Sequence, residues 1–134
     1  MKNSLKEIIT CLIITCFFPC VAWATKINCK EFEIKYYGQA DRLMQEIEVV
    51  ELCARPAEGF RDKVFSNLKY RANRLNTCVQ MVKQGKLGFD CSREFRKTMK
   101  ADGGENCAKE LERMRKSFKK FETLFSRFKP CLEK

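Results

Sequence analysis

The sequence predicts an all-α fold, a small disulfide-stapled helical bundle with three long helices and one short crossing helix. Apolar residues recur every three or four positions along most of the chain, and strand-like alternation is absent. Glycine or proline separates these apolar stripes. The long helices are predicted at residues 30–54, 58–84 and 106–129, and the short helix at 91–101.

The first two predicted helices each place their apolar residues on one face. The first helix ends before Pro56, and the second ends at Gly85, a typical C-terminal stop. Arg71 interrupts the second stripe without an evident reason. The first stripe comprises Cys29, Phe32, Tyr36, Ala40, Leu43, Ile47, Val50 and Ala54; the second comprises Phe60, Val64, Leu68, Leu75, Cys78, Val79 and Val82.

The last two predicted helices have start signals of their own. Asp90 is a suitable N-cap for the short helix, which ends before the Gly103-Gly104 pair, and Asn106 is a suitable N-cap for the final helix. The final helix has the most regular stripe of all. It comprises Cys107, Leu111, Met114, Phe118, Phe121, Phe125, Phe128 and Leu132.

Residues 1–24 have the three parts of a signal peptide. Lys2 and Lys6 precede an apolar run that ends in the cleavage pattern Ala22-Trp23-Ala24. The apolar run is short for a membrane anchor, contains Pro19 and meets no stop-transfer sequence. We therefore expect a secreted, extracellular protein with no transmembrane segment, in which residues 25–134 form a single helical disulfide-rich domain.

Six cysteines remain after such cleavage, and three disulfides are the expected state in an oxidising compartment. Zinc is a weak alternative, because the chain has no histidine and no Cys-x2-Cys pair. Six cysteines permit fifteen pairings. If the long helices run up, down and up, with the short helix crossing beneath them, Cys53 meets Cys131. The remaining pairs are then predicted, with less support, as Cys29–Cys107 and Cys78–Cys91.

The positive charge lies mainly in the later part of the chain. Without residues 1–24 the chain has 25 basic and 16 acidic side chains, a net charge of +9. Residues 25–58 have a net charge of −2, and residues 59–134 a net charge of +11. On a helical wheel, five cations of the final helix collect opposite its apolar stripe. This basic ridge comprises Lys109, Arg113, Lys116, Lys120 and Arg127.

The composition argues against an enzyme and against a cofactor or metal site. Without histidine the chain lacks the usual general base at neutral pH and a common metal ligand. The cysteines are expected in disulfides rather than as nucleophiles, and no phosphate-binding glycine loop is present. No nucleic-acid recognition motif accompanies the basic charge, so no specific nucleic-acid partner is expected.

Four interpretations of the final helix remain open at this point. The simplest is a core helix with a solvated charged face. The functional hypothesis is an interaction protein, an effector of the saliva, venom or cytokine kind, whose basic ridge binds an acidic protein or a glycosaminoglycan such as heparin. The alternative is a carrier of a hydrophobic small molecule or lipid in a pocket among Phe118, Phe121, Phe125, Leu43 and Leu68. Membrane permeabilisation is a further hypothesis, which disulfides at both ends of the helix disfavour.

Overall fold

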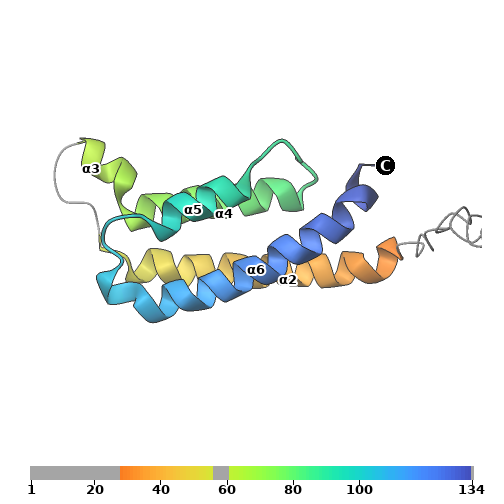
Figure 1. Ribbon diagram of the computed structural model, residues 1–134, viewed down its shortest axis with the longest axis horizontal. Coiled ribbons are helices and arrows are strands. Elements are labelled where there is room, and N and C mark those ends of the chain that lie inside the picture. The colour runs from red at the N-terminus through yellow and green to blue at the C-terminus, as the bar shows by residue number, and fades with distance from the viewer. Residues whose placement is uncertain (1–27, 56–60, 134) are drawn as a thin grey trace, which may run out of the picture.

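The computed structural model describes residues 28–55 and 61–133, with the side chains of 61–63 left aside, and confirms the all-α fold (Figure 1). Within these ranges there is no strand, only an isolated bridge between Asn67 and Asp102. The predicted signal peptide, residues 1–24, lies outside the described residues. The elements are α2 (Cys29–Cys53), α3 (Arg61–Ser66), α4 (Leu68–Lys83), α5 (Cys91–Met99), the 3-10 helix η1 (Glu105–Cys107) and α6 (Ala108–Leu132).

The two 25-residue helices, α2 and α6, form a long antiparallel pair. Figure 1 shows α4 and α5 above this pair, with α5 turning back alongside α4. At about 1.5 Å per residue, α2 and α6 are each about 37 Å long, whereas α4 is about 24 Å long. The α4–α5 layer therefore covers only part of the α2–α6 pair.

The core lies between these helices and is built from the predicted stripes. Tyr36, Leu43 and Ile47 of α2 are fully buried, as are Leu68 and Leu75 of α4. Aromatic rings continue the core along α6: the Phe95 and Phe118 rings stack with centroids 4.1 Å apart, and Tyr36 lies 4.9 Å from Phe128 and 5.8 Å from Phe121. Apolar periodicity alone thus identified the buried faces.

The predicted second helix, 58–84, is wrong as one continuous element, because it breaks at Asn67. The backbone of Asn67 is extended, and its side chain accepts a hydrogen bond of 2.9 Å from the Lys69 amide, so Asn67 is the N-cap of α4. The Leu68 and Asp102 backbones also bond across this break. Val64 of α3 is consequently 37% exposed instead of joining the core stripe, and Phe60 lies outside the described residues.

The other helix ends agree with the sequence signals in some places and not in others. The Asp90 carboxylate caps α5 by accepting a 2.9 Å bond from the Arg93 amide, as predicted. Gly85 has a φ of +83°, and its amide and that of Lys86 bond back to α4 carbonyls, which is a Schellman C-terminus. Asn106 does not cap α6, because it lies inside the 3-10 turn η1.

The structure corrects two of the predicted disulfides. Cys29 pairs with Cys131 and Cys53 with Cys107, whereas the predicted pairs were Cys53–Cys131 and Cys29–Cys107. The assumed up-down-up order is wrong: α5 does not cross beneath the bundle but runs back along α4, so the chain returns to the Cys53 end before α6 starts (Figure 1). The Cys78–Cys91 bond joins α4 to α5 as predicted, and it holds this reversal in place.

Candidate anion-binding groove

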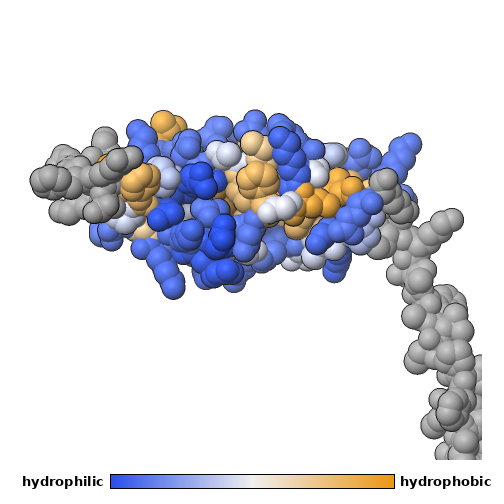
Figure 2. Space-filling view, turned by 90° about the horizontal axis from the view of Figure 1, so that it is seen from above, coloured by the Kyte–Doolittle hydropathy of each residue, from blue (hydrophilic) through white to orange (hydrophobic). Residues whose placement is uncertain are grey.

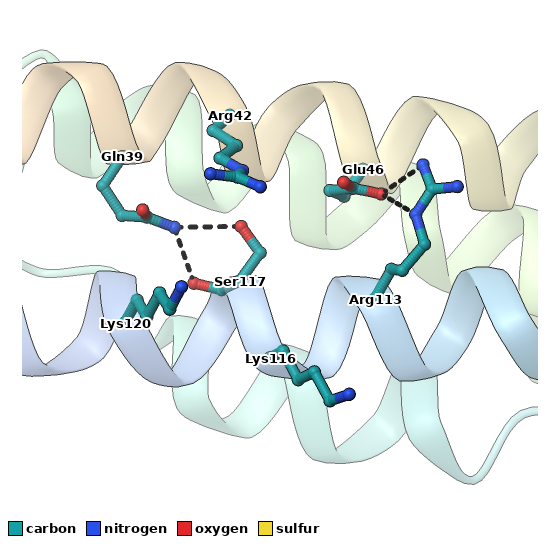
Figure 3. A pocket seen from close by; sticks show the side chains of 7 residues that line it. All are labelled: Gln39, Arg42, Glu46, Arg113, Lys116, Ser117 and Lys120. Carbon is teal, nitrogen blue, oxygen red and sulfur yellow. Dashed lines mark hydrogen bonds and ion pairs between the residues drawn. The ribbon is translucent and has the colours of Figure 1, made fainter.

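The basic ridge predicted on α6 borders a groove between α6 and α2. A cavity of about 150 Å³ opens there. From α6 it is lined by Arg113, Lys116, Ser117 and Lys120. The facing wall comes from α2 and comprises Gln39, Arg42 and Glu46 (Figure 3).

Three of the five ridge residues therefore lie at this groove, and two do not. Arg113, Lys116 and Lys120 line it, whereas Lys109 and Arg127 are exposed elsewhere along α6 and are not among its lining residues. All five side chains are in exposed positions. The basic ridge is thus exposed along its whole length, and its central part faces α2 across the groove.

The groove contains more positive than negative charge. Arg42, Arg113, Lys116 and Lys120 supply four cations, and Glu46 supplies the single carboxylate, so the lining has a net charge of +3. A concave site with one dominant sign of charge attracts counter-ions more strongly than the same charges on a flat surface. The groove is therefore suited to an anionic group.

Glu46 is held by one of these cations. Arg113 donates from Nε to Glu46 Oε2 over 3.0 Å, and its second nitrogen lies 2.9 Å from the same oxygen. Only 16% of the Glu46 side chain is exposed. Arg113 is consequently engaged by the protein itself, and the charge left over for a ligand comes from the other three cations.

The remaining cations have weak partners or none within the described part of the chain. Lys116 lies 3.7 Å from Glu112, one turn earlier on α6. No hydrogen bond or ion pair of the described residues involves Arg42 or Lys120. In Figure 3 the Arg42 guanidinium and the Lys120 ammonium point into the space between the two helices, whereas Lys116 extends away from Arg42.

A neutral contact fixes the floor of the groove. The Gln39 amide donates to the Ser117 backbone carbonyl over 3.0 Å and to Ser117 Oγ over 2.9 Å. Ser117 is 6% exposed, so this hydroxyl is a buried polar group with a defined partner. Gln39 and Ser117 thereby set the spacing between α2 and α6 beside Arg42 and Lys120.

The α2 contribution to the groove was missed by the sequence analysis. Gln39, Arg42 and Glu46 follow one another by three and four positions, so they share a face of α2 beside its apolar stripe. That spacing is visible in the sequence. What is not visible is that this face lies opposite α6, because that depends on the reversal made by α5.

The proposed carrier pocket is occupied by protein side chains in this structure. Phe118 and Phe121 are each 2% exposed, and Leu43 and Leu68 are fully buried. Phe121 stacks on Phe125 with centroids 6.0 Å apart. A hydrophobic ligand would have to displace these rings to enter.

No cluster of three or more cysteine, aspartate or glutamate side chains in residues 28–55 and 61–133 is arranged to hold a metal ion. None of the helices in this part of the chain is both long and apolar enough to cross a membrane.

Comparison with known proteins adds no functional assignment. No protein-family model, curated protein sequence or solved structure shows significant similarity to this chain.

Proposed function

We propose that the protein is a secreted, non-enzymatic interaction protein that binds an acidic partner, a glycosaminoglycan or an acidic protein, through the basic ridge and the groove beside it. The observation that carries this proposal is the charge of the groove, which is lined by four cations and by one carboxylate that is already paired. Three disulfides fit an oxidising, extracellular compartment.

The ridge has the length and the accessibility that an extended polyanion needs. Lys109 and Arg127 are 18 positions apart on one helix, which corresponds to about 27 Å at 1.5 Å per residue. All five ridge cations are exposed, so a polyanion can reach them without any change in the fold. Binding to such a surface depends strongly on salt, because exposed charges are screened over about 8 Å at physiological ionic strength.

Heparin affinity chromatography of the oxidised protein tests the proposal. The double variant Lys116→Gln/Lys120→Gln removes two cations at the groove, and Arg96→Gln/Lys100→Gln removes two exposed cations near α5. We expect the first variant to elute at clearly lower salt than the second, although both have the same net charge. Equal elution of the two variants would show that heparin responds only to total charge and would overturn the proposed site.

The carrier alternative has no observation of this kind in its favour. Its Phe residues pack against Tyr36 and one another, and the groove described above is lined by polar and charged side chains. Mass spectrometry of the natively purified protein tests it directly. A stoichiometric bound lipid would support the carrier function over the proposed one.

A further inference from the structure

We propose that the groove is a clamp for a single sulfate ester of a sulfated polysaccharide, formed by Arg42 of α2 with Lys120 and Ser117 of α6. This inference rests on the proposed function and specifies its central subsite. It assigns the main role to Arg42, which lies outside the basic ridge, and a lesser role to Arg113, which belongs to it.

The two cations of the clamp come from opposite walls. Arg42 and Lys120 both line the cavity, and neither has a hydrogen bond or ion pair within the described residues. In Figure 3 their charged ends converge from α2 and α6 on the space beside Ser117. Two cations that line the same cavity repel each other, and an anion between them relieves this repulsion, so the arrangement favours an anionic occupant.

Ser117 supplies a neutral donor at the floor of the groove. Its Oγ accepts a hydrogen bond from the Gln39 amide over 2.9 Å. A hydroxyl has one hydrogen to donate in addition to its acceptor lone pairs, and no acceptor for this hydrogen lies among the described residues. The hydroxyl hydrogen is therefore available to an occupant of the cavity that Ser117 lines.

The number of these donor groups favours a tetrahedral anion over a carboxylate. Arg42 offers the N–H groups of its guanidinium from α2, whereas Lys120 offers an ammonium and Ser117 a hydroxyl from α6. A sulfate ester has three terminal oxygens, one for each donor group. A carboxylate has only two oxygens and cannot serve three donor groups equally well.

Glu46 does not oppose this occupant. Its carboxylate accepts two contacts from Arg113 and is mostly buried, so its charge is offset within the protein. The pair lies at one end of the groove, and the clamp residues Arg42, Ser117 and Lys120 lie toward the other end (Figure 3). The local charge at the clamp is therefore set by Arg42 and Lys120.

Nuclear magnetic resonance titration with sodium sulfate, at constant ionic strength, tests the clamp. We expect saturating shifts of the Arg42, Ser117 and Lys120 amides with sulfate and no saturation with sodium acetate. Arg42→Gln and Lys120→Gln should each weaken sulfate binding at least fivefold. Arg96→Gln and Lys100→Gln remove the same charge from exposed positions outside both the groove and the basic ridge and should leave sulfate binding unchanged. Shifts that do not saturate, or equal losses in all four variants, would overturn the clamp.

Heparin binding separates the clamp from the proposed function. We expect Arg42→Gln to weaken heparin binding severalfold more than Lys109→Gln, and fully desulfated heparin to abolish this difference. Failure of the unmodified protein to bind heparin overturns the glycosaminoglycan partner of the proposed function, while the sulfate titration still decides the clamp. A phosphopeptide that binds the groove more tightly than heparin would overturn the assignment to a polysaccharide.

Discussion

Arg113 on α6 binds Glu46 on α2 through two nitrogens that share one carboxylate oxygen, at 3.0 and 2.9 Å. The two residues are 67 positions apart in the sequence. Their contact turns one predicted ligand-binding cation into a link between the helices. It also means that loss of either partner should have different effects on ligand binding and on stability.

Glu46→Gln should strengthen heparin binding, because it releases Arg113 and removes the only carboxylate of the groove lining. An exposed charge contact contributes about 0.2–1 kcal/mol, so we expect a gain of up to about fivefold. Arg113→Gln should weaken heparin binding less than Lys120→Gln, since Lys120 has no hydrogen-bond or ion-pair partner within residues 28–55 and 61–133. Isothermal titration with a heparin oligosaccharide measures both. An Arg113→Gln loss as large as that of Lys120→Gln would contradict the assigned role.

Removal of a disulfide should destabilise the fold more, the longer the loop that the disulfide closes. The sequence separations are 102 for Cys29–Cys131, 54 for Cys53–Cys107 and 13 for Cys78–Cys91. On the chain-entropy model these loops correspond to about 4.7, 4.2 and 2.9 kcal/mol. Urea unfolding of the three paired Cys→Ser variants measures the order. The largest loss for the Cys78–Cys91 pair would show that loop length does not determine these contributions.

The sequence predicted most of the local structure, apart from the break at Asn67 and the start of α6, but it did not predict the topology. Tyr36, Leu43 and Ile47 are buried because helical periodicity alone fixes which face of α2 is apolar. The partners of Cys29 and Cys53 depend instead on the direction of α5, and nine residues of helix give no local signal of whether they cross the bundle or run back along it. The wrong direction assumed for α5 therefore exchanged the predicted partners of Cys29 and Cys53.

The same distinction explains the candidate site. The α6 cations are identifiable on a helical wheel, since only one helix is involved. The pairing of Arg113 with Glu46 and the contribution of Arg42 arise from the contact between α2 and α6, which no spacing within either helix indicates. Asn67 is an intermediate case: asparagine is a favoured N-cap, but the apolar stripe across it predicted one continuous helix.

Gly38→Ala should stabilise the protein by about 0.5–1 kcal/mol, because Gly38 lies inside α2 and a Cβ there would meet no atom within 4 Å. Gly85→Ala is the matched control. Its Cβ also enters open space, but its φ of +83° costs an L-residue about 1–2 kcal/mol. Thermal unfolding should therefore move in opposite directions for the two variants. If the unfolding temperatures of both variants moved in the same direction, backbone conformation would not determine the effects of the two substitutions.

Tyr36→Phe should stabilise the protein by about 1 kcal/mol at neutral pH, since the Tyr36 hydroxyl is buried without a hydrogen-bond partner among the described residues. The ring contacts with Phe121 and Phe128 remain in the variant. Tyr70→Phe is the control, because Tyr70 is only half-buried and should change stability little. Urea unfolding at pH 7 measures both, and a clear loss for Tyr36→Phe would indicate a partner that the hydroxyl does have.

The same tyrosine should make stability fall at high pH. Burial, with a smaller contribution from neighbouring Tyr37, raises the pKa of Tyr36 to about 12. The ordinary pKa of tyrosine is about 10, so between pH 10 and 12 the unfolded chain loses this proton while the folded protein keeps it. Unfolding then releases a proton, and the free energy of unfolding decreases as pH rises through this window. Below pH 10 both states are protonated and the effect vanishes.

Urea unfolding from pH 8 to 11.5 tests this pH dependence. The free energy of unfolding should decline more steeply for the unmodified protein and for Tyr70→Phe than for Tyr36→Phe. Identical slopes in all three proteins would mean that Tyr36 ionises as readily in the folded state as in the unfolded one.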